Sequence, residues 1–298
     1  MKLKLHFMLL ATILSSVFMM EKRYASAYTP FVTQLIKGEV PTADMDLEKS
    51  NQLKHAPFCI DLQSNKRTTL DDAPAGSIAV IKVKGAIMKD DWCGIPGTET
   101  LSRMTTEAGN HPNVSAVMFD IDSGGGEADG TETFANTIKS VKKPTVAFVN
   151  TWACSAAYWV ASGADEIIAS EQGALTGSIG VMITMADYTE YYNELGIKIH
   201  NIYSNLSPDK NQEFHQALDG NYELMQKNIL DPLAKVFHAA VNKNRTGKLD
   251  TAKEDVMTGK VYYSKDAKVA GLIDSIGNFE SAVKRANQLT KELTINFS

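Results

Sequence analysis

The sequence predicts an α/β fold with a mainly parallel sheet. Three apolar runs have the length and composition of buried strands, and they cover residues 77–88, 114–122 and 144–150. Segments in which apolar residues repeat at helical spacing lie between these strands, at residues 99–110 and 128–141. Strands that alternate with helices form βαβ units, and such units connect parallel strands.

The alternation continues beyond residue 150. We expect a helix directly after Ser155, a helix at residues 188–195 and a strand at residues 197–204. A long helix towards the C-terminus is predicted at residues 211–244. Pro232 should kink or split it, because proline lacks the N–H that a helix interior needs. The rest of the chain predicts a strand, a helix, a short strand and a helix in that order.

The residues before the first long strand differ in character from those after it. We therefore divide the chain into an N-terminal helical region and linker at residues 1–75, a main domain at residues 76–290 and a tail at residues 291–298. Within the first region, a helical arm is expected at residues 24–37 and a polar linker at residues 38–57.

The first 27 residues can be interpreted in two ways. A basic start followed by an apolar run is the pattern of a signal peptide or membrane anchor. Glu21, Lys22 and Arg23 interrupt that pattern, and the apolar run is shorter than the roughly 20 residues of a membrane-spanning helix. The alternative is an amphipathic helix that packs on the body or on a second subunit. A cytoplasmic location is favoured, while an anchored or exported protein stays open.

The overall composition excludes some classes of function. The chain has 298 residues, of which 44% are hydrophobic, and a formal net charge of −5. An acidic balance argues against nucleic-acid binding, which needs a basic face. The cysteines at positions 59, 93 and 154 have no metal-binding spacing and no obvious disulfide pairing, so a reducing compartment fits best.

A glycine-rich segment, "DIDSGGGEADG" at residues 120–130, follows the second strand. Consecutive glycines let the backbone turn sharply and bring N–H groups close to a ligand. The segment lacks the spacing of known nucleotide-binding loops, so nucleotide binding is weakly supported. The alternative is a tight loop that holds no ligand.

The stretch "VNTWACSAAYWVAS" places Ser155 among small residues at a predicted strand-to-helix turn. Such turns lie at the carboxyl edge of a parallel sheet, where α/β proteins place their sites. If Ser155 is a nucleophile, the N–H of Ala156 and one from Gly125 or Gly126 can hold an oxyanion, at about 2.7–4 kcal/mol per donor. Ser155 as a core residue, or Cys154 as the nucleophile, are the alternatives.

A serine nucleophile needs a base, and the residues alone do not select one. The next histidines along the chain are His200 and His215, and neither has a local triad signature. A lysine can replace histidine if burial keeps its amine neutral. Lys210 and Lys198 are both candidates on spacing alone.

Five motifs, in order, resemble the signal peptide peptidase A family of serine peptidases. They are "FDIDSGGGEADG", "ACSAAYWVASGADEIIA", "GALTGSIGV", "SPDKNQEF" and "GKVYYSKDAKVAGLIDSIG", and the resemblance covers residues 77–289. It implies the Clp-protease/crotonase type of spiral α/β fold. The chain carries one such unit and looks most like the short members encoded in phages and prophages, which are linked to head maturation.

The resemblance also implies a set of site residues. Ser155 matches the family's nucleophile and Lys210 its general base, which together form a Ser–Lys dyad. Gly125 and Gly126 match the family's oxyanion glycines, and Ser178 matches a serine that supports the lysine. Ala156 stands where the family usually has glycine, and it keeps the backbone N–H. No metal and no cofactor is implied.

The prediction is therefore a serine endopeptidase that acts on polypeptides through an acyl-enzyme and assembles as a homo-oligomer. A phage-type protease of head or scaffold maturation is favoured, and a bacterial enzyme that degrades residual signal peptides is the alternative. Two other classes stay open: a crotonase-type acyl-CoA enzyme and a non-catalytic assembly factor.

Overall fold

The structure is a computed structural model that describes residues 18–20, 45–92, 94–171, 173–185, 187–250 and 256–296. Its strands are β1 (Phe18–Met20), β2 (Phe58–Ile60), β3 (Arg67–Thr68), β4 (Ser77–Lys84), β5 (Val114–Ser123), β6 (Gly125–Glu127), β7 (Thr145–Cys154), β8 (Glu166–Ala169), β9 (Leu175–Gly177), β10 (Val261–Tyr263) and β11 (Ser275–Ile276). Its helices are α4 (Met45–His55), α5 (Thr98–Asn110), α6 (Thr131–Ser140), α7 (Ala156–Ser162), α8 (Thr189–Glu194), α9 (Gln212–Leu218), α10 (Glu223–Met225), the π-helical turn η2 (Gln226–Leu230), α11 (Asp231–Asn244), α12 (Ser264–Val269) and α13 (Phe279–Asn296).

Long parallel strands form the centre of the main sheet. The order β10-β9-β7-β5-β4-β2-β3 places β4, β5 and β7 side by side, and all three run parallel. The first part of β7 pairs with β8 and its last part pairs with β9, both in parallel, so the sheet divides part-way along β7. Antiparallel strands close the edges, with β2 and β3 at one side and β10 at the other. The predicted α/β class with a mainly parallel sheet is confirmed.

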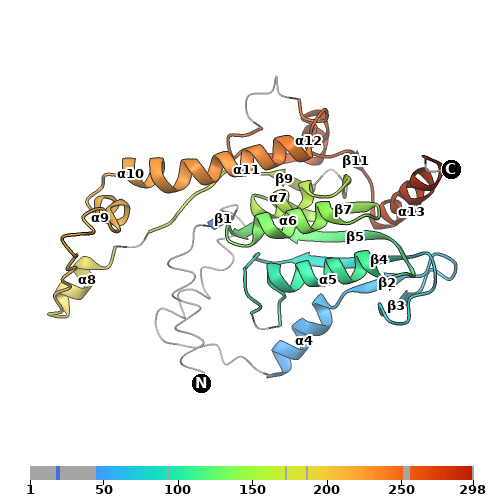
Figure 1. Cartoon of the computed structure of the whole chain (residues 1–298), viewed down its shortest axis with the longest axis horizontal. Helices are drawn as coiled ribbons and strands as arrows, with labels where there is room; N and C mark the ends of the chain where they lie inside the picture. Colours follow the sequence, from blue (N-terminus) through green and yellow to red (C-terminus); the bar gives the residue numbers. More distant parts are fainter. Residues whose placement is uncertain are drawn as a thin grey trace.

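Helices cover both faces of this sheet (Figure 1). On one face, α5, α6, α7 and α11 enclose the larger apolar core, in which Trp159 of α7 and Phe237 of α11 stack at 4.8 Å between ring centres. On the other face, α13 packs Ala282 and Ala286 against the sheet, and Phe279 meets Phe148 edge to face. The strands buried on both faces are the continuous apolar runs of the sequence, as expected for parallel strands.

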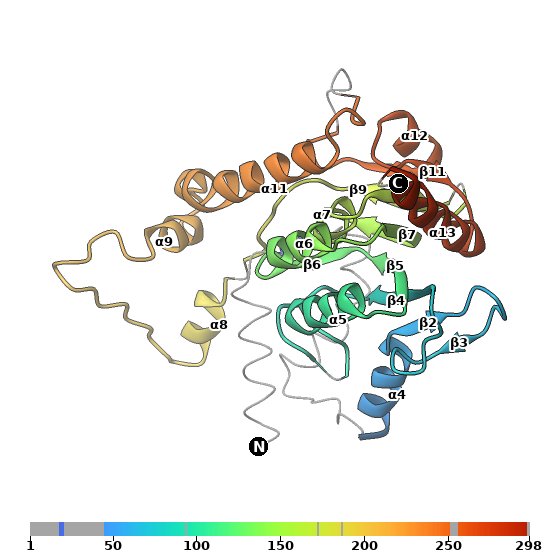
Figure 2. The same ribbon diagram turned by 45° about the vertical axis from the view of Figure 1, so that its right-hand side comes forward.

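Residues 187–222, which we call the arm, lie away from this body. They include α8 and α9, and Figures 1 and 2 both show these helices set apart from the sheet, between β9 on one side of the chain and α11 on the other. The arm exposes many large apolar side chains, namely Tyr191, Leu195, Ile197, Ile199, Ile202, Leu206, Phe214, Leu218 and Tyr222. Ile202 and Leu206 are each 93% exposed. Patches of this kind mark contact surfaces in soluble proteins.

Most elements predicted along the body are confirmed. The strands β4, β5 and β7 and the helices α5, α6 and α7 lie where the sequence predicts them. The strand–helix–strand–helix order of the last residues is also confirmed, by β10, α12, β11 and α13. The helix α13 continues to Asn296, through most of the segment that we designated a tail.

Three expectations differ from the structure. No strand forms at residues 197–204, because these mostly exposed residues have no neighbouring strand within the described chain. The helix predicted at residues 211–244 is broken after α9, and the π-helical turn η2 comes just before Pro232, which lies in the first turn of α11. The expected linker at residues 38–57 contains the helix α4. The helical arm expected at residues 24–37 lies outside the described residues.

Candidate active site

The Ser155 backbone has a conformation that few non-glycine residues adopt. It lies between β7 and α7 with φ 57° and ψ −123°. Its N–H donates to the Gly177 carbonyl at 2.8 Å, and its own carbonyl accepts from the N–H groups of Tyr158 and Trp159 at 2.9 and 3.0 Å. Strained residues persist only where their surroundings hold them, and they cluster at functional sites. A serine on a strained strand-to-helix turn is also the geometry of nucleophile elbows.

The Ser155 side chain is buried and close to a carbonyl. The residue is 2% exposed, and its hydroxyl donates to the Gly180 carbonyl over a long 3.4 Å. In the described part of the chain, this hydroxyl has no basic side chain as a hydrogen-bond partner. The backbone of Ser155 is therefore held in place, while none of the described basic side chains hydrogen bonds to its hydroxyl.

The glycine-rich segment lies beside the end of β7. Ser123, the last residue of β5, pairs with Ala153, and β6 then packs against α7. A side chain at Gly126 would place its Cβ 1.9 Å from the Ile87 carbonyl oxygen, so only glycine fits there. Gly125 has φ 107°, a conformation that also favours glycine.

The two candidate oxyanion glycines have different surroundings. The N–H of Gly125 donates to the Ser123 hydroxyl at 3.1 Å. The neighbours of Gly126 in β6 bond to Ile87: the Gly125 carbonyl accepts from its N–H at 3.0 Å, and the Glu127 N–H donates to its carbonyl at 2.8 Å. Because backbone groups alternate along a strand, the N–H of Gly126 points to the opposite edge.

Ala156 and Ser178 lie on either side of Ser155. Ala156 is the first residue of α7 and fully buried, and an N–H in the first turn of a helix has no acceptor within that helix. Ser178 follows Gly177, whose carbonyl accepts the Ser155 N–H, and has φ 52°. Ser155, Ala156 and Ser178 thus lie around the carboxyl end of β7, and Gly126 lies in β6, the short strand that packs against α7.

The two candidate lysines lie elsewhere. Lys210 is exposed and precedes α9 in the arm, and Lys198 is exposed in the same arm. The structure does not bring Lys210 to Ser155, since the arm extends away from the body (Figures 1 and 2). Of the predicted dyad, Ser155 is therefore buried in the body, and Lys210 is exposed to solvent in the arm.

The rival residues are not placed for catalysis at this site. His200 is exposed in the arm, and His215 of α9 contacts the Tyr203 hydroxyl there through its Nε2. Cys154 is fully buried, with its thiol directed to the Leu175 carbonyl at 3.7 Å. Cys93 lies outside the described residues. Among the described residues, no cluster of three or more His, Cys, Asp or Glu side chains could hold a metal ion.

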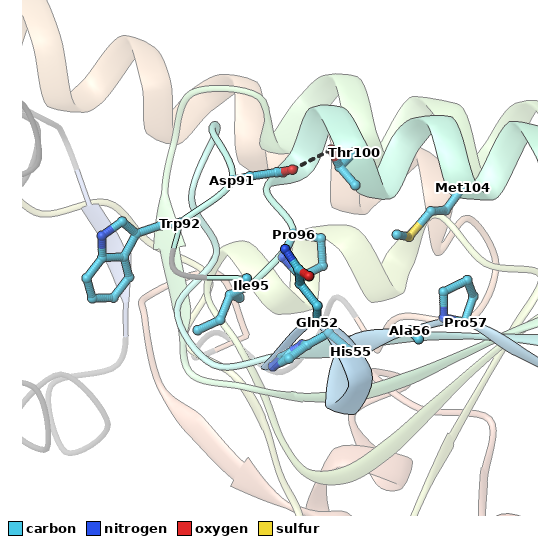
Figure 3. Close-up of a pocket in the computed structure, with 11 residues that line it drawn as sticks. Gln52, His55, Ala56, Pro57, Asp91, Trp92, Ile95, Pro96, Thr100 and Met104 are labelled. Atoms are coloured by element: carbon cyan, nitrogen blue, oxygen red, sulfur yellow. Dashed lines mark hydrogen bonds between the residues drawn. The ribbon is translucent and has the colours of Figure 1, made fainter. Parts of the chain in front are cut away.

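Two features were not expected from the sequence. The strand β1 pairs with β6 at the candidate oxyanion glycines, and the signal for it is no more than a short apolar run near the N-terminus. A cavity of about 320 Å³ also opens between α4, α5 and the loop after β4 (Figure 3). Asp91 on its wall accepts a hydrogen bond from Thr100 at 2.9 Å.

The cavity in Figure 3 is separate from the candidate active site. None of its lining residues is Ser155, Gly126, Ala156 or Lys210. His55 on its wall has a lowered pKa, because burial and then the nearby positive charges of Lys82, Lys84 and Lys54 disfavour its protonated form.

Among the described helices, none is long and apolar enough to cross a membrane.

Comparison with known proteins places the chain in a family. The model of Peptidase family S49 matches residues 137–293. Protease 4 of Salmonella typhi is 29% identical over 220 residues, which are 72% of this chain and 35% of that protein. Capsid assembly protease C of Escherichia phage lambda is 29% identical over 213 residues, which are 69% of this chain and 48% of that protein. The chain thus spans from about a third to about half of the length of these two relatives.

A solved structure, ClpP1 of Listeria monocytogenes, matches 68% of this chain and 94% of its own length, with 13% identity and a TM-score of 0.44. The family model covers more than half of the chain and includes Ser155, Ser178 and Lys210. The chain belongs to peptidase family S49.

Proposed function

We propose that this protein is a serine endopeptidase with Ser155 as its nucleophile. The observation that carries the proposal is the strained backbone of Ser155, which hydrogen bonds on both sides hold between β7 and α7. Membership of family S49 and the adjacent glycine strand β6 support it. A merely structural serine at a helix start would not need a disfavoured backbone conformation.

In the proposed reaction, the neutral amine of Lys210 takes the proton of the Ser155 hydroxyl as Oγ attacks a peptide carbonyl carbon. The N–H groups of Gly126 and Ala156 bind the oxygen that becomes negative. The Lys210 ammonium then gives its proton to the leaving amine, the C–N bond breaks, and an ester to Ser155 remains. A water molecule, deprotonated by the same lysine, hydrolyses the ester and restores the hydroxyl.

The three remaining predicted positions have unequal parts in this proposal. Gly125 contributes mainly by its backbone conformation, because its N–H already donates to Ser123. Gly126 is the better donor, because its N–H points away from the bonds to Ile87. Ser178 is proposed to hold the amine of Lys210 beside the carboxyl end of β7.

We further propose that Lys210 reaches Ser155 from a neighbouring copy of the chain. A lysine amine acts as a base only where a dry surround keeps it neutral, and the arm is exposed in the single chain. The apolar side chains of the arm, and residues 197–204 with no neighbouring strand in the described chain, fit a surface that a second copy covers. The protein is accordingly proposed to be a homo-oligomer.

The test of the dyad uses matched substitutions. We expect Ser155→Ala to abolish labelling by a fluorophosphonate and cleavage of casein. Lys210→Ala should lower kcat/KM by roughly 10²–10⁴-fold, the usual contribution of a general acid–base group. Lys198→Ala, which changes another exposed lysine of the same arm, should leave the rate unchanged. A Lys210→Ala variant that cleaves casein at the wild-type rate would refute the assignment.

The biological setting is proposed from a relative. Because the similar lambda protein is named for capsid assembly, we favour a phage-type protease that acts on a scaffold or head protein. We place its action in the cytoplasm and its peptidase domain at residues 76–290. Degradation of residual signal peptides is the second setting. Mass spectrometry of the products from a peptide library would distinguish a defined cleavage motif from general cleavage of apolar segments.

Each of the two non-peptidase classes predicts a result that the peptidase proposal does not. A crotonase-type enzyme would bind acyl-CoA tightly and resist fluorophosphonate labelling. A non-catalytic assembly factor would support assembly fully as Ser155→Ala. The geometry at Ser155 favours the peptidase, because neither alternative requires a serine held in this conformation.

A further inference from the structure

The short strand β1 lies on the edge of β6. It runs antiparallel to β6, and the pairs are Phe18 with Glu127, Met19 with Gly126 and Met20 with Gly125. These three residues come from the far N-terminal end of the chain, more than a hundred positions before their partners. The contact therefore brings a distant segment onto the strand that we propose as part of the oxyanion site.

The two edges of β6 pair with different segments of the chain. Ile87 occupies one edge, through its bonds with the Gly125 carbonyl and the Glu127 N–H. The N–H and carbonyl of Gly126 point to the other edge, because backbone groups alternate along a strand. Met19 is the partner of Gly126 at that edge. The segment thus occupies the side of β6 that carries the proposed oxyanion donor.

An extended peptide substrate would use the same backbone groups. Peptides commonly bind at a free strand edge by adding one more strand, with main-chain hydrogen bonds for affinity. A carbonyl oxygen of Met19 and a substrate oxyanion cannot both accept the one N–H of Gly126. Binding of β1 and binding of a reacting substrate are therefore mutually exclusive at this position.

We propose that β1 is an internal inhibitor that occupies the substrate-accepting edge of β6, an inference that rests on the proposed peptidase function. The edge accepts an extended apolar segment in antiparallel orientation, and the residues Phe18, Met19 and Met20 provide one. The enzyme becomes active towards a polypeptide when that polypeptide displaces β1.

The test compares two substitutions at one position. Met19→Pro removes the N–H that faces Gly126, whereas Met19→Ala keeps the backbone and serves as the control. We expect Met19→Pro to raise kcat/KM for a short peptide about five-fold over Met19→Ala, since a backbone hydrogen bond contributes about 1 kcal/mol net. A synthetic peptide with the sequence of residues 16–21 should inhibit Met19→Pro competitively and more strongly than a scrambled peptide.

A second measurement does not depend on activity. Hydrogen exchange at the Gly126 amide should be faster in Met19→Pro than in Met19→Ala. The amides of Gly125 and Glu127, which bond to Ser123 and Ile87, should not change. Equal exchange at Gly126 in the two variants would overturn the placement of β1.

The outcomes also separate this inference from the proposed function. Equal kcat/KM in the two Met19 variants, with Ser155 still labelled by a fluorophosphonate, would overturn the inhibitory role of β1 alone. If Ser155 is not labelled even in Met19→Pro, the peptidase proposal fails, and the inhibitory role of β1 fails with it.

Discussion

The end of β7 and the arm contrast in how firmly the structure holds them. At the end of β7, Ser155 is buried, strained and bonded through its backbone on both sides. In the arm, Lys210 is exposed, next to apolar side chains that nothing in the described chain covers. The position of Ser155 is fixed by backbone hydrogen bonds within one chain, whereas Lys210, the proposed base, is exposed in that chain.

This difference indicates how activity could depend on assembly. The body holds Ser155 rigidly, but among the described residues no basic side chain hydrogen bonds to its hydroxyl. In the proposed mechanism the serine stays unreactive until a base reaches it. The helix α11 connects the two regions, since it packs on α7 at one side and leads to α9 through α10 at the other. Substitutions in the body should therefore change catalysis, and substitutions in α11 should change the free energy of unfolding.

The largest effect is expected in the body, at Gly126. Gly126→Ala would force a Cβ to within 1.9 Å of the Ile87 carbonyl oxygen, so β6 must shift and its N–H must leave the oxyanion position. We expect kcat/KM to fall by about 10²–10³-fold, as for the loss of an oxyanion donor. Gly173→Ala is the control, because open space surrounds that glycine. Equal rates in the two variants would show that β6 is not part of the site.

The next effect concerns the attachment of α11 to the body. Phe237 is fully buried and stacks on Trp159, so Phe237→Ala should lower the free energy of unfolding by about 3–5 kcal/mol. The neighbouring Val236 is 42% exposed. Val236→Ala should change the free energy of unfolding by less than about 0.5 kcal/mol. Urea denaturation of both variants provides the measurement. Similar losses in both would mean that α11 is not anchored through this stack.

A smaller and pH-dependent effect is expected at the far end of α11. Arg245, which is 1% exposed, follows this helix and pairs with Asp274 at 2.7 Å. Burial alone would raise the pKa of the Asp274 carboxyl, but the hydrogen bonds and charge of Arg245, with help from Lys248, hold that pKa below its ordinary value.

The sign of the pH dependence follows from that lowered pKa. The ionised carboxyl stabilises the folded state at pH values above the pKa of the unfolded state, about 3.9, and this contribution is lost as the pH falls towards the folded-state pKa. Asp274→Asn should reduce the free energy of unfolding by about 3 kcal/mol at neutral pH, because it leaves Arg245 buried without its partner. In denaturation curves, the difference in the free energy of unfolding between the two proteins should be constant from pH 7 to about pH 5 and should narrow as the pH falls from about 5 to about 3. A constant difference across that range would exclude the carboxyl charge as the cause.

The body could be predicted from the sequence because its signals are local. The apolar runs of β4, β5 and β7 are buried on both faces, and Ser155 follows directly after one of them. The glycines of β6 have local reasons: Ile87 leaves no room for a side chain at Gly126, and Gly125 has φ 107°. That the Gly125 N–H is already bonded to Ser123 depends on the fold of that turn, so the sequence could not distinguish the two glycines.

The less predictable parts are those whose partners lie far away. The helix α4 has good helix formers but no apolar stripe, so periodicity gave no indication of it. Residues 197–204 have the alternation of a strand, but a strand needs a neighbour, and the described chain offers none. The pairing of β1 with β6 joins segments more than a hundred residues apart, and no turn signal connects them.

The decisive experiment is to mix the Ser155→Ala and Lys210→Ala variants under conditions in which subunits exchange. If each Lys210 acts on the Ser155 of a neighbouring subunit, both variants are inactive alone, and the mixture regains peptide cleavage at about one quarter of the wild-type rate, the fraction of sites with both groups in a random closed ring. A mixture that stays as inactive as its components, although light scattering shows that mixed oligomers form, would contradict a dyad built from two chains.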